Sequence, residues 1–307
     1  MRTYSDIQTF SPIKNAVVTI GTFDGVHIGH QKIISSLRKS AKELGGETVI
    51  LTFFPHPRMI LHPEDQELKL ITTIKEKAQL LEASGIDHLI ITPFTRDFSN
   101  LSPEDYIKQI LVDKIGTRKI IIGYDHRFGK NREGGIEQLQ KFAPIYGFEV
   151  EVIPEQDMHQ VAVSSSKIRQ ALLSGDVQTA HEFMGHPFSL HGKVIKGDQI
   201  GRKMGYPTAN LFIEENYKLI PSDGIYAVKL EIKNKPYQGM AYIGHRPTIN
   251  GMSRNIEVNI FDFEEDIYGE TIRMDFLHYI REDQKFNSLA ELSHQLSLDK
   301  IAALRLL

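Results

Sequence analysis

The periodicity of apolar residues changes near residue 184, and this change constrains the fold more than any other feature of the 307-residue chain. Before it, short apolar runs alternate with stretches whose apolar residues recur every three or four positions. The runs are 16–20, 48–54, 88–92, 119–123 and 148–153, and the helical stretches are 30–44, 74–84 and 102–115. Apolar strands that alternate with helices predict a parallel sheet covered on both faces. The first half is therefore predicted to be doubly wound α/β.

Beyond residue 184, helical periodicity does not return until Ser288, which is spaced from Glu291 as in a capping box. The intervening residues predict strands, because polar and apolar side chains mostly alternate. These strands are 188–195, 208–213, 225–232, 237–244, 255–263 and 271–280, with a turn at 233–236. Such strands predict a small closed antiparallel barrel or a sandwich, followed by a helix. We expect two domains, 1–184 and 185–307, connected through the helical stretch 166–185.

Composition excludes several classes of protein. A formal net charge of −3 argues against a general nucleic-acid binder, and the absence of cysteine excludes disulfides and thiolate chemistry. No apolar run approaches the roughly 20 residues that span a bilayer, and the first residues lack a signal-peptide pattern. We expect a cytoplasmic protein without nucleic-acid, membrane or obligate protein partners.

Two histidines, His27 and His30, follow the first predicted strand in the string GTFDGVHIGH (21–30). Ligands of open α/β sheets bind outside the carboxyl ends of strands, and a helix that begins there offers unpaired N–H groups to a phosphate. Residues three apart share a helix face, so both imidazoles can reach one ligand. One histidine could instead cap the helix or pack. A zinc pair is disfavoured because no third ligand is evident.

Three further segments are polar at predicted sheet edges or helix starts. They are FFPHP (53–57), GYDHRFGKNREGG (123–135) with Asp125, and SSSKIR (164–169) with Ser165, Ser166 and Arg169. The last is an expected phosphate clamp, because hydroxyls and a guanidinium meet at a helix start. Each segment alone could be a solvated loop, but together they predict a phosphate-binding site.

The second half carries its own nucleotide signal in GDQIGRKMGYPTANL (197–211). The hydroxyl of Thr208 and the amide of Asn210, at a strand entry, could hold Mg²⁺ and phosphate oxygens. Glu257 alternates with apolar neighbours on the polar face of its strand, where it could act as a general base or simply meet water. By composition alone the loop could also be a plain hairpin.

GTFDGVHIGH resembles the signature of the HxGH nucleotidyltransferases. In the second half GxxxGxPTAN, DGIYAV, IGHRPT and EVNIFDFEEDIYGE look like a riboflavin kinase domain. With FPHP, GYDHRFG and SSSKIR, the chain resembles the prokaryotic bifunctional riboflavin kinase/FAD synthetases along essentially its full length. The resemblance implies a Rossmann-like HxGH nucleotidyltransferase domain, then a six-stranded antiparallel β-barrel kinase domain with a C-terminal helix.

The resemblance also implies two ATP-dependent reactions with Mg²⁺: riboflavin to FMN, then FMN to FAD with release of pyrophosphate. Glu257, His27 and His30 would be catalytic. In the first domain the nucleotide- and flavin-binding residues would be Gly21, Phe23, Asp24, Asp125, Ser165, Ser166 and Arg169. In the second they would be Gly197, Gly201, Lys203, Gly205, Thr208 and Asn210, with Thr208 and Asn210 also serving the metal.

Three positions depart from the family pattern: His126 stands where Phe is frequent, Asn259 where His is common, and Ser166 where Thr is usual. None of these changes removes a reactive group, so both activities are expected. Two alternatives are an HxGH enzyme for another acceptor, such as a cytidylyl- or pantetheine-phosphate adenylyltransferase, and an idle flavin-binding regulator. The PTAN string disfavours the first, and the five intact residues His27, His30, Thr208, Asn210 and Glu257 disfavour the second.

Overall fold

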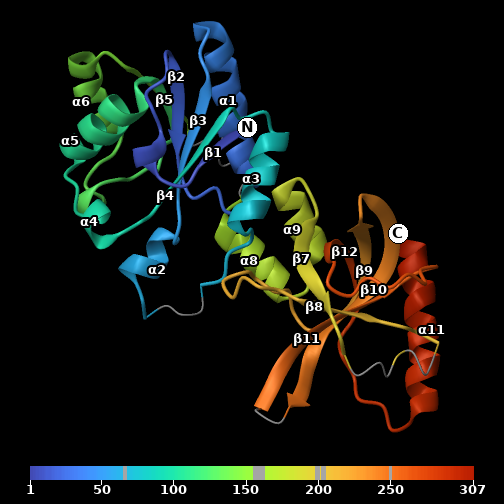
Figure 1. Cartoon of the computed structure of the whole chain (residues 1–307). Coiled ribbons are helices and arrows are strands. Elements are labelled where there is room, and N and C mark those ends of the chain that lie inside the picture. The colour runs from blue at the N-terminus through green and yellow to red at the C-terminus, as the bar shows by residue number, and fades with distance from the viewer. Residues whose placement is uncertain (65–67, 155–162, 198–200, 202–204, 249–250) are drawn as a thin grey trace. The chain divides into compact units, whose positions relative to one another are not determined.

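A computed structural model of the chain describes residues 1–64, 68–154, 163–197, 201, 205–248 and 251–307. The chain folds into two compact units, Met1–Ser164 and Ser165–Leu307. Figure 1 shows both units, coloured from blue at the N-terminus to red at the C-terminus. None of the helices in these described ranges has the length and apolar character that crossing a membrane requires.

The first unit contains a parallel sheet whose strand order is β1-β4-β3-β2-β5-β6. Its strands are β1 (Arg2–Tyr4), β2 (Ala16–Ile20), β3 (Thr48–Phe53), β4 (His88–Thr92), β5 (Thr117–Gly123) and β6 (Glu149–Ile153). The predicted parallel sheet is confirmed. The sequence pattern missed β1, because three residues at a sheet edge show no periodicity.

Helices cover both faces of this sheet because successive strand residues point to opposite sides. Val17, Ile50 and Leu89 pack in one buried cluster with residues of α1 and α3, whereas Val18, Leu51 and Ile90 pack in another with the segment after α5 and with α6. The helices of the unit are α1 (Ile28–Leu44), α2 (Pro57–Leu61), α3 (Ile74–Ala83), α4 (Arg96–Ser99), α5 (Pro103–Asp105) and α6 (Ile136–Tyr146). The unit is therefore doubly wound, as predicted.

The predicted helix 102–115 differs in its geometry. Ser102 caps α5 as expected, but the backbone then continues as a π-helical segment, Tyr106–Ile115, which ends at Gly116 in the left-handed region. Its buried residues, including Tyr106 and Ile110, face the second cluster. A period-3.6 pattern does not distinguish this wider helix from an α-helix.

The second unit contains a closed barrel with the strand order β10-β11-β8-β7-β12-β9, and all its pairs are antiparallel. Its strands are β7 (Phe188–Ile195), β8 (Ala209–Phe212), β9 (Gly224–Ile232), β10 (Lys235–Thr248), β11 (Gly251–Ile260) and β12 (Thr271–Arg281). Lys233 and Asn234, both with positive φ, form the expected two-residue turn between β9 and β10. Of the two predicted architectures, the structure is a barrel.

Helices on either side of the barrel strands complete the described part of the second unit. The expected closing helix is α11 (Leu289–Leu306), capped by Ser288 and packed against β9, β10 and β12 (Figure 1). The linking stretch forms α8 (Ser165–Leu173) and α9 (Val177–Met184), which pack on each other. Ser222, just before β9, donates its N–H to the carbonyl of Leu172 on α8 over 3.0 Å.

Candidate active sites

The two histidines of GTFDGVHIGH lie at the start of α1, directly after the central strand β2. His27 caps the helix, because its Nδ1 accepts the backbone N–H of His30 over 3.4 Å. The two rings stack with centroids 3.7 Å apart, and the ring of His30 also lies 4.8 Å from that of Phe23. The cap predicted as an alternative role for one histidine is thus present, and the pair stays together at the helix N-terminus.

The environment of His30 keeps its imidazole neutral. Nδ1 of His30 is buried and has no hydrogen-bond partner among the described residues. Burial lowers the pKa of His30 well below its usual value, and the charges of His27 and Lys77 lower it further. An approaching polyphosphate would reverse this effect, because negative charge favours the protonated ring.

The loop between β2 and α1 is held by Asp24, which is 1% exposed. Its two carboxylate oxygens accept the backbone N–H groups of Ile71 and Thr72 over 3.1 and 3.0 Å. The Thr72 hydroxyl also accepts the N–H of Gly25 over 3.1 Å. Asp24 therefore fixes the loop that presents His27, whatever contact it makes with a nucleotide.

Gly21 and Phe23 shape the beginning of the same loop. Phe23 has a φ of +46° and its ring is 1% exposed. A Cβ at Gly21 would lie 3.1 Å from that ring. Gly21 is thus needed so that the Phe23 ring can fold back beneath His30.

Lys77 is a residue of this region that the sequence analysis missed. It lies on α3, is 2% exposed, and its burial lowers its pKa to about 8, although the nearby carboxylate of Asp24 opposes the shift. Its charge also acts on His30. The available signal was its position: Lys77 falls three residues after Ile74 and four before Leu81, within the apolar stripe of the helix.

The strands β2 and β5 lie side by side, and the chain proceeds outward from them in opposite directions. Such a switch point is where open α/β sheets bind ligands. Residues Tyr124 to Gly135 follow β5, and within them Asp125 is exposed while Nε2 of His126 is buried without a partner among the described residues. Burial lowers the pKa of His126 to about 4. The hydroxyls of Thr19 and Thr92 lie near the carboxyl ends of β2 and β4, and both are buried without a partner among the described residues. This edge of the sheet is therefore polar.

The FPHP segment forms the turn from β3 into α2, where Nδ1 of His56 accepts the N–H of Arg58 over 3.2 Å. Ser165, Ser166 and Arg169 all lie on α8 in the second unit, the first two in its opening turn and Arg169 one turn later. The spacing expected of a phosphate clamp at a helix start is therefore present.

The proposed kinase residues converge in the barrel. Glu257 on β11 pairs with Asn210 on β8, and Oε2 of Glu257 accepts the hydroxyl hydrogen of Thr208 over 2.8 Å. Glu257 is only 7% exposed, so it does not simply meet water. The three residues thus belong to one site.

The glycines of 197–211 serve this site by leaving room for other groups. A Cβ at Gly197 would lie 2.3 Å from Nδ2 of Asn210, and one at Gly201 would lie 2.2 Å from the carbonyl oxygen of Tyr206. Gly205 has a φ of +80°, which a side chain would disfavour. Lys203 lies outside the described residues.

Two cavities meet at Thr208. One, of about 230 Å³, is lined by Glu257 and by the rings of Tyr206, Tyr242 and Phe286. The other, of about 320 Å³, is lined by Pro207, Phe263 and Tyr268 and by a run of acidic residues, but not by Glu257. Thr208 therefore lines both a cavity with several aromatic rings and a cavity with several acidic residues.

The chemistry of these donors is compatible with Mg²⁺. Because Thr208 gives its hydrogen to Glu257, the lone pairs of its oxygen can face a cation. The amide of Asn210 lies two residues further along the chain, on β8. Among the described residues, no group of three or more His, Asp or Glu is placed to hold a metal ion. Mg²⁺ typically takes few protein ligands and shares the phosphates of its substrate.

Comparisons with known proteins decide the family. The family model for FAD synthetase matches residues 10–167, and that for riboflavin kinase matches residues 184–307. The bifunctional riboflavin kinase/FMN adenylyltransferase of Listeria monocytogenes is 37% identical, covering 93% of this chain and 90% of its own. Those of Bacillus subtilis and Escherichia coli are 36% and 35% identical, covering 94% and 95% of this chain and 92% and 93% of theirs.

The chain belongs to the bifunctional riboflavin kinase/FMN adenylyltransferase family.

A solved structure agrees with the fold over the whole chain. It is described as a macrolide-efflux protein from Streptococcus pneumoniae, is 32% identical, and superposes with a TM-score of 0.88 over 98% of both chains. The likeness extends the family fold through both units.

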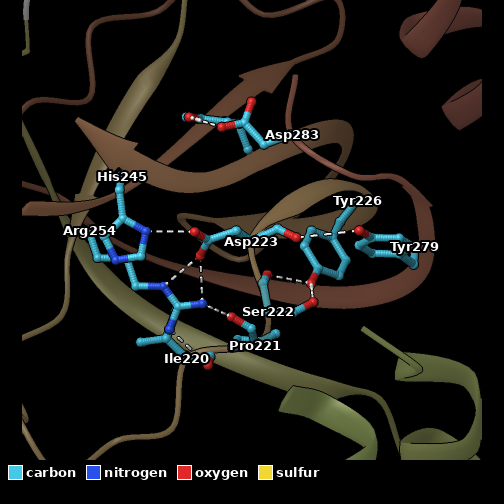
Figure 2. A network of polar contacts seen from close by, with 10 residues as sticks. Ile220, Pro221, Ser222, Asp223, Tyr226, His245, Arg254, Tyr279 and Asp283 are labelled. Atoms are coloured by element: carbon cyan, nitrogen blue, oxygen red, sulfur yellow. Dashed lines mark hydrogen bonds and ion pairs between the residues drawn. The ribbon is translucent and has the colours of Figure 1, made fainter. Parts of the chain in front are cut away.

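An ion-pair network holds β11, the strand that carries Glu257. Asp223 binds Nδ1 of His245 on β10 over 2.6 Å and the guanidinium of Arg254 on β11 over 2.9 and 3.0 Å (Figure 2). Arg254 also donates to the carbonyls of Ile220 and Pro221. The segment before β9 is thereby fixed to β11 three residues before Glu257. The motifs DGIYAV and IGHRPT contribute two of these residues, Asp223 and His245.

Proposed function

We propose that this chain makes FAD in two steps on one polypeptide, with the residue roles set out below. As the family comparisons show, it is a riboflavin kinase and FMN adenylyltransferase, which converts riboflavin to FMN and FMN to FAD with ATP in each step. The observation that supports the residue assignment is the presence of two separate polar sites, one at the switch point of the sheet and one beside β11, where Glu257 lines a cavity together with residues of α11.

In the kinase reaction Glu257 is the general base. It takes the proton of the 5′-hydroxyl of riboflavin while that oxygen bonds to the γ-phosphorus of ATP, and the bond to the β-phosphate oxygen breaks to release ADP. The support is geometric: Glu257 lines a cavity with three aromatic rings and is held by Thr208. Removal of the proton raises the nucleophilicity of an otherwise weak attacking hydroxyl.

The two cavities can be assigned from this chemistry. The flavin hydroxyl must reach Glu257, so riboflavin belongs in the cavity that Glu257 lines, where Tyr206, Tyr242 and Phe286 can contact its planar ring. ATP then belongs in the cavity that shares Thr208 but not Glu257. The reacting γ-phosphate would lie where the two meet, beside Thr208.

Mg²⁺ is proposed at Thr208 and Asn210. Bound there, the ion would neutralise charge on the phosphate oxygens of ATP. The chain's own contribution is to hold these two oxygen donors in place: Thr208 through Glu257, and Asn210 through its position against Gly197. Gly197, Gly201, Lys203 and Gly205 would close over the nucleotide.

In the adenylyltransferase reaction an oxygen of the FMN phosphate bonds to the α-phosphorus of ATP, and pyrophosphate leaves. The attacking oxygen is already ionised, so no base is required. His27 and His30 would contact the triphosphate and stabilise charge on the departing pyrophosphate, aided by the α1 N-terminus. Arg169, Ser165 and Ser166 would grip phosphates, while Gly21, Phe23, Asp24 and Asp125 would shape the nucleotide–flavin cleft.

Two further statements stay predictions. The boundary between activities is placed at residue 184, so that residues 1–184 carry the adenylyltransferase and 185–307 the kinase, although α8 and α9 group by contacts with the second unit. We also place the protein in the cytoplasm, because both reactions consume ATP. Its partners are then small molecules: riboflavin, FMN, FAD and ATP.

A time course tests the function directly. Purified protein is incubated with riboflavin, ATP and Mg²⁺, and the flavins are separated by chromatography. FMN should appear first and then convert to FAD. Formation of FMN alone would assign another acceptor to the HxGH half, such as a cytidylyl or pantetheine substrate. No conversion of riboflavin or of added FMN would instead favour an idle flavin-binding protein.

A further inference from the structure

Three polar side chains share one face of β11 because they alternate along the strand: Asn255, Glu257 and Asn259. Each makes a hydrogen bond on that face. Nδ2 of Asn255 donates to Oε1 of Glu257 over 2.5 Å, and Nδ2 of Asn259 donates to the carbonyl of Pro207 over 2.7 Å. The strand therefore holds both its own glutamate and the segment that leads into Thr208.

The two oxygens of Glu257 are engaged by different donors. Oε1 receives the amide hydrogen of Asn255, and Oε2 receives the hydroxyl hydrogen of Thr208. An ionised carboxylate only accepts hydrogen bonds, so the amide group that faces it must be the NH₂. Because these two donors engage different oxygens, they fix the plane of the carboxylate.

The two donors differ in how they depend on substrate. Thr208 belongs to the proposed nucleotide-binding segment, so its surroundings change when ATP arrives. Asn255 lies on the same strand as Glu257, two residues away, and β11 is held by Asp223 through Arg254, as Figure 2 shows. The contact from Asn255 is thus built into the barrel whether or not a nucleotide is bound.

We propose that Asn255 is a positioning residue for the kinase reaction: its amide holds the Glu257 carboxylate aimed into the flavin cavity. This rests on the proposed role of Glu257 as the base. The hydrogen bond restricts rotation of the carboxylate, on which the rate of proton transfer depends.

The experiment compares Asn255→Ala and Asn255→Asp with the wild type in the full-length protein. Initial rates of FMN formation are measured from pH 5.5 to 9 with riboflavin and ATP varied, and riboflavin binding is measured by fluorescence quenching. Gln238→Ala, which removes an exposed amide from the neighbouring strand β10, is the matched control. FAD formation from supplied FMN reports on the other reaction in the same preparation.

Asn255→Ala is expected to lower kcat for FMN formation by about 10- to 100-fold, with KM for riboflavin changed by less than about threefold. Asn255→Asp keeps the shape of the side chain but brings a second carboxylate, so its rate at neutral pH should fall at least as far. Gln238→Ala and FAD synthesis should match the wild type.

Three results would overturn the proposal. They are an Asn255→Ala variant with kcat within about twofold of the wild type, an Asn255→Asp variant with wild-type rates, and a loss of riboflavin binding that accounts for the whole defect. Glu257→Gln separates this from the underlying assignment. If Glu257→Gln retains FMN formation, the role of the base is wrong; if it abolishes FMN formation while the Asn255 variants behave as wild type, only the role of Asn255 is wrong.

Discussion

Thr208, immediately before β8, donates its hydroxyl hydrogen to Oε2 of Glu257 on β11 over 2.8 Å. This contact joins the PTAN segment to a carboxylate that lines the cavity proposed for riboflavin. It therefore gives Glu257 a fixed position relative to the proposed nucleotide segment.

Replacement of Glu257 tests that position. Glu257→Gln keeps the size of the side chain but removes the basic oxygen, so FMN formation should fall by at least about 100-fold. FAD formation from supplied FMN should be unchanged, because the other site does not use this residue. Both rates are read from the same chromatogram. Loss of both activities in a folded variant would contradict the assignment of two sites.

His30→Ala should show the opposite selectivity. The substitution removes the His30 ring, which stacks on His27, and with it the buried Nδ1 of His30. FAD synthesis should fall by about 100-fold or more, as expected for loss of a donor to developing negative charge, whereas riboflavin phosphorylation continues. Steady-state rates of the two reactions check this. His62→Ala, at an exposed position in the same unit, is the control. Undiminished FAD synthesis would remove His30 from the site.

Lys77→Met should stabilise the first unit while impairing FAD synthesis. The folded pKa of Lys77 is about 8, below the unfolded value of 10.5, so the buried charge costs about 3 kcal/mol below pH 8. The unfolded state binds more protons, so wild-type stability rises as pH increases from 8 toward 10.5. The gain from Lys77→Met should therefore be largest at pH 6 to 7 and shrink above pH 8.

Thermal unfolding of the full-length protein at pH 6.5 and pH 9.5 measures this effect. Lys75→Met, at an exposed position on the same helix, is the control and should leave the thermal stability and the rate of FAD synthesis nearly unchanged. A Lys77→Met protein that is less stable at pH 6.5 would show that Lys77 contributes net stability through Asp24 instead.

Gly197→Ala should weaken the use of ATP in the kinase reaction. Its Cβ would lie 2.3 Å from Nδ2 of Asn210, so the amide must move away from its position beside Thr208. We expect kcat/KM for ATP in FMN formation to fall by about 10-fold or more, which corresponds to at least about 1.4 kcal/mol. Initial rates with ATP varied measure this, and FAD synthesis from FMN serves as the internal reference. An unchanged kcat/KM would show that the position of Asn210 does not matter for the nucleotide.

The sequence predicted a good deal of the fold because its strongest patterns are local. The apolar strands of the first half and the alternating strands of the second predicted a parallel sheet and a barrel or sandwich, and both units follow. The missed strand β1 and the π-helical segment 106–115 mark the limit of such patterns. A short edge strand is defined by its neighbour β4, and a wider helix by packing, so neither leaves a periodic signal.

The candidate sites divide in the same way. The residue types and spacing of His27, His30, Thr208 and Glu257 were readable from the chain, because reactive groups occur in short motifs. Lys77 and Asn255 could not be identified from the sequence, because their roles depend on contacts that form only in the folded protein. The sequence places Glu257 on a polar strand face, where contact with water is the alternative to a catalytic role. Its 7% exposure shows that the folded chain buries it, in a cavity that residues of α11 also line.

The sequence by itself thus determined the two kinds of domain and the motifs that bear the chemistry. The tertiary structure alone decided that the alternating strands close into a barrel, that Asp24 anchors the histidine loop, and that Asn255 and Thr208 hold the two oxygens of Glu257. The physical reason is range: periodicity and capping act over a few residues, whereas burial, shifted pKa values and hydrogen bonds between strands depend on residues that only folding brings together.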